Sequence, residues 1–480
     1  MISMNIKLSR ELIILIVGRV LQILISLVTI KISTKILDVN EMGNLYLILT
    51  ITSFFGLFFI NPIGQYINRK THEWYSESKL LDIFYIYNLY ILFLSFISVG
   101  IITLLYKFGV ANEIEWILLV SLIFVYIYFN TWHKTIIPMI NMLEGRIAFV
   151  IFTILTQIFS FVFAYIAINI FDKNGVYWFL GQTMALVVLS FVSLLYFILK
   201  IQNNFNLKKS MSLITIKSIK NIMNFSLPLS FGVLFLWMQT QSYGIIIEKN
   251  IGSEFLGYLG VGLAISAAIT GSFETIIMQY FYPTMYKSMN NEVEFSIMIS
   301  KIINLILPLY LLLAIFVTYF AQYLTIILVD EKFHESYIYL IFAIWIAFFR
   351  MSSNMISNIA HAKLTTKKLI LPYMIGGICA VVGVVLATQS SYYKIYIPLA
   401  LLISNILSFF VMYIEMNNLL RIKLDLKNFY LVLFYTLPFS IIVFFYSYDI
   451  SYFYSVLLVF IFGIYFLFIL YKLFIRKEKS

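Results

Sequence analysis

Long apolar runs separated by short polar segments constrain this chain most strongly. Each run has about 20 residues or more, the length that a helix needs to cross roughly 30 Å of hydrocarbon. Of the 480 residues, 62% are hydrophobic and 11% are charged, and a water-soluble domain with this composition would expose large apolar patches. A transmembrane barrel would instead alternate apolar and polar residues over segments of about ten. The sequence therefore predicts an all-α, polytopic membrane protein.

The apolar runs predict about 14 transmembrane helices, which satisfy their own backbone hydrogen bonds within the bilayer. The predicted spans are residues 12–33, 45–67, 83–106, 116–142, 147–170, 176–199, 222–247, 255–282, 302–324, 337–360, 369–387, 395–414, 429–445 and 452–471.

The distribution of basic residues predicts the orientation of these spans. Of the 33 Lys and Arg residues, 23 fall on the side that carries Lys7 and Arg10, seven fall on the other side, and Arg19, Lys134 and Arg350 fall within spans. Cytoplasmic loops carry the excess of Lys and Arg. We therefore expect a multi-pass protein of the inner (plasma) membrane with both termini in the cytoplasm. The same placement explains the net charge of +11 without a nucleic-acid partner.

A basic segment divides the chain into two similar halves. We expect a six-helix bundle at residues 1–200, a basic cytoplasmic linker at 201–221, a second six-helix bundle at 222–416, and two additional helices with a cytoplasmic tail at 417–480. A faint repeat follows the first helix of each half, at 38–46 and 252–258. Parallel repeats of this kind place a cavity between two bundles, the usual basis of alternating access.

Three cationic side chains are predicted at membrane depth, where ionisable groups are costly and usually face a cavity or a partner. Arg19 lies nine residues after Arg10, about 13 Å along a helix. A polar stripe continues from Arg19 through Gln22, Ser26, Thr29 and Ser33. Helix packing is the alternative explanation of this stripe.

A second stripe begins at Arg350, near the middle of the tenth span, and includes Asn354, Ser357 and His361. A structural ion pair of Arg350 with Glu274 of the eighth span is the alternative to a binding role. His361 is expected to mark the cytoplasmic end of its helix.

The fourth span carries a third polar group, which consists of Asn130, His133 and Lys134 ahead of Pro138. A proline at this position is expected to bend the helix near the polar group. For Lys134, the alternative is snorkelling to the cytoplasmic interface, and for His133 it is a structural role.

These charges favour an anionic cargo. The first six spans contain two deep cations and no clear intramembrane carboxylate, whereas a cation or drug antiporter would need one for ion coupling. Four scattered His residues and the single Cys379 offer no metal-ligand spacing, and we expect neither a metal nor a cofactor. Because no loop could hold a catalytic domain, we expect a transporter and not an enzyme.

Several short motifs resemble those of a known family. These motifs are residues 36–46, the Glu144-Gly145-Arg146 step, and Phe225-Ser226-Leu227-Pro228. Together with the layout, they are similar to the polysaccharide-biosynthesis flippases of the multidrug/oligosaccharidyl-lipid/polysaccharide exporter superfamily. An Asp-Arg pair ends the seventh helix in many relatives; here the region reads Ser242-Tyr243-Gly244, so that pair is not carried over.

This resemblance to O-antigen flippases implies an undecaprenyl-diphosphate-linked oligosaccharide as cargo. The fourteen helices also resemble the lipid II flippases, in which the last two helices line a groove for the lipid tail; residues 429–471 would occupy that place. Membrane lipids, a polysaccharide polymerase and a chain-length regulator are the other expected partners.

Our hypothesis is that Arg19, Lys134 and Arg350 line an inward-facing cavity and bind the diphosphate, since Arg engages phosphate oxygens in bidentate fashion. The further candidate binding residues are Gln22, Ser26, His133, Asn354 and Glu274. Two alternatives remain open. An O-antigen polymerase or ligase would need a large periplasmic loop, whereas the outer loops here reach only about a dozen residues. A multidrug extrusion antiporter of the same fold would need the missing carboxylate.

Overall fold

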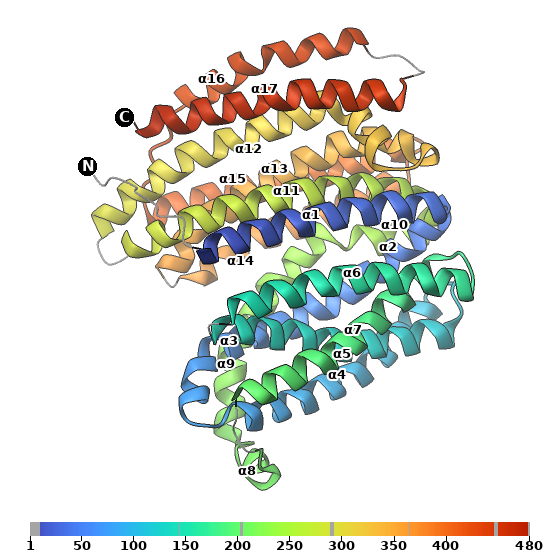
Figure 1. Cartoon of the computed structure of the whole chain (residues 1–480), viewed down its shortest axis with the longest axis vertical. Coiled ribbons are helices and arrows are strands. Elements are labelled where there is room, and N and C mark those ends of the chain that lie inside the picture. The colour runs from blue at the N-terminus through green and yellow to red at the C-terminus, as the bar shows by residue number, and fades with distance from the viewer. Residues whose placement is uncertain are drawn as a thin grey trace. The chain divides into compact units, whose positions relative to one another are not determined.

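The computed structural model describes residues 10–143, 145–201, 205–288, 292–363, 365–445 and 450–478. Lys7 and Glu144, which supported the predicted orientation and the family resemblance, lie outside these residues. Throughout the described ranges the chain forms helices and no strands, and 14 of the helical segments are long and apolar enough to cross a membrane. The prediction of an all-α, polytopic fold is confirmed (Figure 1).

The α-helices follow one another with short connections. They are α1 (Arg10–Ile36), α2 (Val39–Phe54), α3 (Asn61–Ser76), α4 (Leu80–Lys107), α5 (Trp116–Met142), α6 (Arg146–Ile170), α7 (Gly175–Ile201), α8 (Leu207–Ser212), α9 (Ile216–Thr240), α10 (Tyr243–Asn250), α11 (Ser253–Ser288), α12 (Glu292–Leu328), α13 (Tyr337–Ala362), α14 (Ile370–Thr388), α15 (Tyr393–Leu419), α16 (Lys427–Thr436) and α17 (Tyr452–Glu478). A π-helical segment covers Phe55–Ile60, and 3₁₀-helices cover Glu331–Ser336, Thr366–Leu369 and Leu437–Phe445.

The described residues form two compact units. The first unit holds the residues up to Thr29 and Asn44–Trp237, and the second holds Ile30–Gly43 and the residues from Met238 onward. The chain passes from one unit to the other inside α1, inside α2 and inside α9. The domain boundaries expected from the sequence, after residues 200, 221 and 416, stay a prediction.

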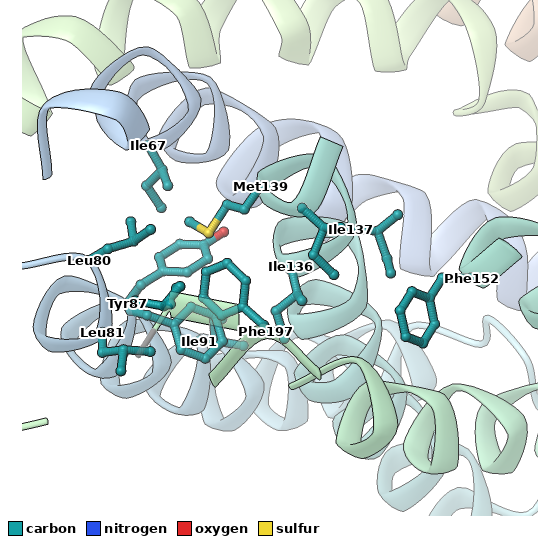
Figure 2. Close-up of a cluster of buried hydrophobic side chains, with 13 residues drawn as sticks. Ile67, Leu80, Leu81, Tyr87, Ile91, Ile136, Ile137, Met139, Phe152 and Phe197 are labelled. Atoms are coloured by element: carbon teal, nitrogen blue, oxygen red, sulfur yellow. The ribbon is translucent and has the colours of Figure 1, made fainter. Parts of the chain in front are cut away.

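An apolar cluster contributed by five helices forms a core of the first unit (Figure 2). It brings Ile67 of α3, Tyr87 of α4, Ile136 of α5, Phe152 of α6 and Phe197 of α7 together, each at most 8% exposed. Because closely packed side chains resist rotation of the helices that carry them, this cluster fixes the orientation of α5, the helix with His133 and Lys134.

The second predicted span is longer and less regular than its hydropathy indicates. Helix α2 continues through the π-helical segment into α3, and the whole element of 38 residues is about 57 Å long at the standard rise. The end of α3 therefore projects beyond the hydrocarbon. Single π-helical turns are frequent at functional sites, and hydropathy alone gives no signal for them.

Two other predicted spans are interrupted. The seventh, expected at 222–247, is broken between Thr240 and Tyr243 into α9 and α10. The thirteenth, expected at 429–445, changes from α16 to a 3₁₀-helix at Leu437. Pro438 explains the second interruption, because proline lacks an amide hydrogen and its ring clashes with the carbonyl four residues earlier.

The two repeated motifs pack against each other in the second unit. A Cβ atom on Gly43 would lie 1.9 Å from the carbonyl oxygen of Ser253, and one on Gly257 would lie 2.1 Å from the carbonyl oxygen of Val39. Real Cβ contacts essentially never fall under 3.0 Å. Only glycine fits at either position, so the faint sequence repeat marks a backbone-to-backbone crossing of α2 and α11.

The basic segment between the halves is tied to the first unit by a buried carboxylate. Asp82, in the first turn of α4, is 1% exposed. Its Oδ1 accepts hydrogen bonds from the Ser210 hydroxyl at 2.9 Å and from the Asn206 amide at 3.1 Å. The Lys209 ammonium lies 3.6 Å from its Oδ2. Asp82 therefore anchors α8.

Replacing Asp82 with Ala should loosen this anchor. The substitution leaves the Asn206 amide without its acceptor and removes the counter-charge of Lys209, at a cost of about 1–3 kcal/mol. We expect limited trypsin digestion to cleave at Lys208 and Lys209 several-fold faster than in the wild type. Ser212→Ala is the control, because the Ser212 hydroxyl bonds only to the Lys209 carbonyl in its own helix; equal cleavage rates of both variants would contradict the anchor.

Candidate functional site

In the first unit, α1 presents Arg19 together with Gln22. The Arg19 Nη1 donates a hydrogen bond of 2.8 Å to the Gln22 Oε1, as their spacing of three residues allows. A Cβ on Gly18 would lie 2.6 Å from the Val150 Cγ1, so α1 approaches α6 closely and its rotation is fixed next to the guanidinium. Gln22 is 7% exposed and Arg19 is half-buried. Arg19 thus has a neutral partner and keeps its charge uncompensated by a carboxylate of this helix.

Two other polar side chains of the α1 stripe form hydrogen bonds with the backbone of their own helix. The Thr29 hydroxyl donates to the Ile25 carbonyl at 2.7 Å, and the Ser33 hydroxyl donates to the Ile30 carbonyl at 3.0 Å. Such bonds within one helix need no ligand, in keeping with the helix-packing explanation for this part of the stripe. Ser26 is half-buried, and it remains a predicted binding residue.

Helix α5 places two candidate residues in different surroundings. His133 is 8% exposed, and its Nε2 lies 2.6 Å from the Thr156 hydroxyl of α6. The next residue, Lys134, is the one exposed side chain among residues 122–142 of this helix. It forms neither a hydrogen bond nor a salt bridge with another described residue. His133 therefore has a structural partner, whereas the Lys134 ammonium is available to a ligand.

The second unit contains the remaining candidates. The Asn354 Nδ2 of α13 donates a 3.1 Å hydrogen bond to the Glu274 Oε1 of α11. Arg350 interacts electrostatically with Glu274, but the two form no salt bridge. The direct Arg350–Glu274 salt bridge considered above is thus not formed. The Asn354 carboxamide bonds to the Glu274 carboxylate instead, and the Arg350 guanidinium has no hydrogen-bonded partner among the described residues.

One buried carboxylate was missed from the sequence. Asp82 lies just outside the third predicted span but inside α4. There its carboxylate accepts the hydrogen bonds that anchor α8. Its position directly after the buried Leu80 and Leu81 was the available signal. Among the described residues, no group of three or more His, Cys, Asp or Glu could hold a metal ion. Arg19, Lys134 and Arg350 form no salt bridge with another described residue.

The arrangement of the helices is shared with solved structures of a lipid flippase and of multidrug transporters. The structure matches that of the lipid II flippase MurJ in an inward closed conformation, with a TM-score of 0.75, 15% sequence identity, and coverage of 98% of this chain and 99% of that chain. It also matches the Vibrio cholerae MATE transporter VcmN, with a TM-score of 0.58, 11% identity, and coverage of 88% and 97%. An inward-facing multidrug resistance MATE family transporter gives a TM-score of 0.52 at 14% identity, with coverage of 87% and 97%.

The sequence identifies the family directly. A profile of the polysaccharide biosynthesis protein family matches residues 8–289, which is more than half of the 480 residues. The chain therefore belongs to the polysaccharide biosynthesis protein family, as its motifs suggested. A comparison with curated protein sequences finds no significant match.

Proposed function

We propose that this protein moves an undecaprenyl-diphosphate-linked oligosaccharide, such as an O-antigen repeat unit, from the cytoplasmic to the outer leaflet of the inner membrane. Membership of the polysaccharide biosynthesis family supports a glycan cargo. The proposal of an anionic headgroup is supported by two unpaired cations: Arg19 bonds only to a neutral carboxamide, and Lys134 has no partner among the described residues. In this proposal the termini are cytoplasmic, and the protein is a transporter and not an enzyme.

The electrostatics favour this cargo. A diphosphate carries several anionic oxygens, and charge-assisted hydrogen bonds to Arg or Lys are about twice as strong as neutral ones. In this proposal the cations predicted from the sequence, Arg19, Lys134 and Arg350, bind this group. The other predicted binding residues are Gln22, Ser26, His133, Asn354 and Glu274. Outward movement of negative charge is favoured in an inside-negative cell by about 2.3 kcal/mol per charge per 100 mV. Membrane potential alone can thus assist transport.

Deletion of the gene tests the proposal. We expect loss of the surface polysaccharide and accumulation of lipid-linked glycan in the inner leaflet, both reversed by the wild-type gene. Normal surface polysaccharide in the deletion strain would contradict the proposed function.

A multidrug extruder is the second candidate function, because the fold is shared with multidrug resistance transporters. The same deletion strain separates the two. An extruder predicts increased drug sensitivity with unchanged polysaccharide, and a flippase predicts the reverse.

Replacing Glu274 should raise the affinity of the protein for undecaprenyl diphosphate. Glu274→Gln keeps an oxygen that accepts from Asn354 but removes the charge that attracts Arg350. Because that carboxylate competes with phosphate for the guanidinium, we expect the variant to bind undecaprenyl diphosphate several-fold more tightly. Titration in detergent micelles measures the affinity, and Glu254→Gln, at the exposed start of α11, is the control. Weaker binding by the Glu274 variant would show that the carboxylate supports the site.

A further inference from the structure

A polar face on α3 is not used by any role assigned so far. Asn61 and Gln65 lie one turn apart near the end of the second predicted span, and the Gln65 Nε2 donates to the Asn61 Oδ1 at 3.4 Å. Gln65 is exposed and Asn61 is half-buried. Ile67 and Thr71, on the other side of the helix, are buried. The two carboxamides therefore point away from the core of the first unit.

These carboxamides do not fit a face that meets lipid chains. Each carboxamide has two N–H donors and one carbonyl oxygen, and the bond between the two uses one donor and one acceptor. No other bond joins them to a described residue. Three N–H groups would thus remain unsatisfied in hydrocarbon, where each costs several kcal/mol. The face requires water or a polar ligand.

Aromatic side chains lie in the turns just before Asn61. Phe54 and Phe58 stack with their centroids 5.7 Å apart and their planes at 18°, and Phe58 precedes Asn61 by three residues. Trp237 of α9 meets Phe54 edge-on at 5.0 Å, and its indole N–H donates to the Ser53 hydroxyl at 3.0 Å. All three rings are half-buried, so each keeps some accessible surface beside the carboxamides.

The helix has open space beside these side chains. A Cβ on Gly64, directly before Gln65, would meet no atom within 4 Å. Carboxamides bind vicinal hydroxyls, which both donate and accept hydrogen bonds, while an aromatic ring packs on the apolar C–H face of a pyranose. A diphosphate needs neither group, and a lipid tail cannot satisfy the carboxamides.

We propose that Phe54, Phe58, Asn61 and Gln65, here named the α3 sugar face, bind the glycan of the lipid-linked substrate. Asn61 and Gln65 hold sugar hydroxyls, and the Phe rings pack on a sugar face. This proposal rests on the proposed function, because it concerns the glycan of that substrate. The α3 sugar face makes the protein sensitive to the glycan, whereas the cations respond to the diphosphate.

Binding measurements on two probes test this division. The probes are undecaprenyl diphosphate and the lipid-linked oligosaccharide extracted from a strain deleted for this gene, and undecaprenol is the uncharged reference. The test protein is the purified full chain with Asn61→Leu and Gln65→Met, which remove hydrogen bonding at nearly constant volume. Asn169→Leu on α6 is the matched control, since its carboxamide donates to the Tyr165 carbonyl in its own helix.

We expect the wild type and the control to bind the glycosylated probe about tenfold more tightly than undecaprenyl diphosphate, as two hydrogen bonds allow. The double variant should lose that gain and bind undecaprenyl diphosphate unchanged. A retained gain, equal wild-type affinity for both probes, or loss of undecaprenyl diphosphate binding by the variant would each overturn the α3 sugar face. If the wild type binds neither probe better than undecaprenol, the proposed function itself fails.

Discussion

Arg19→Gln should lower transport of the lipid-linked glycan at least about tenfold while the protein still folds. A hydrogen bond to a charged group contributes about 1.5–3 kcal/mol, which corresponds to a factor of about 10 to 150 in binding. The substitution removes the cation that α1 presents beside Gln22, and its loss costs little stability because Arg19 bonds only to Gln22. Surface polysaccharide of the complemented deletion strain, normalised to protein level, measures the effect.

Two further variants sharpen this test. Arg19→Lys keeps the charge but loses bidentate geometry, so we expect intermediate transport. Arg421→Gln removes a guanidinium from an exposed loop after α15 and should leave transport unchanged. If the Arg19→Gln and Arg421→Gln variants had equal transport, the guanidinium of Arg19 would have no part in binding.

Gly43→Ala should destabilise the second unit by about 3 kcal/mol or more. The new Cβ would lie 1.9 Å from the Ser253 carbonyl oxygen, so α2 and α11 would have to separate by about 1 Å in a closely packed region. A clash with backbone cannot be relieved by a change of rotamer. The thermal midpoint of the purified protein in detergent should therefore fall by several degrees, with a lower yield from membranes.

Gly100→Ala is a matched control with the opposite sign. Gly100 lies in α4, and a Cβ there would meet no atom within 4 Å. Since Ala favours the helix over Gly by up to about 1 kcal/mol, this variant should be as stable as the wild type or more so. A small effect of Gly43→Ala, comparable to that of Gly100→Ala, would mean that the crossing is not closely packed.

Hydropathy predicted the number of spans but not their internal geometry. A window of 20 apolar residues reports that a segment can cross the bilayer; it does not report hydrogen-bond register. The π-helical turn at Phe55–Ile60 lies within apolar sequence, so it did not change the hydropathy pattern. The interruption after Thr240 coincides with the polar run 239–242, and the apolar residues on both sides of that run still gave one continuous predicted span. The 3₁₀-helix that begins at Leu437 does have a signal in the sequence, because Pro438 cannot donate a backbone hydrogen bond.

Contacts within one helix were more predictable than contacts between helices. The Arg19–Gln22 bond follows from residue spacing, as does the polar stripe that begins at Arg350. The His133–Thr156 bond joins α5 to α6, and spacing gives no information about which residues of two helices meet. For the same reason, the partner of Glu274 proved to be Asn354 and not Arg350.

The crossing of the two repeated motifs has a genetic consequence. Each glycine faces a main-chain oxygen, of Ser253 or of Val39, and every amino acid carries that atom. No substitution at position 253 can therefore make room for a side chain at position 43, and none at 39 can do so for 257. A selection for suppressors of Gly43→Ala should return reversions of that codon and no compensating change at Ser253.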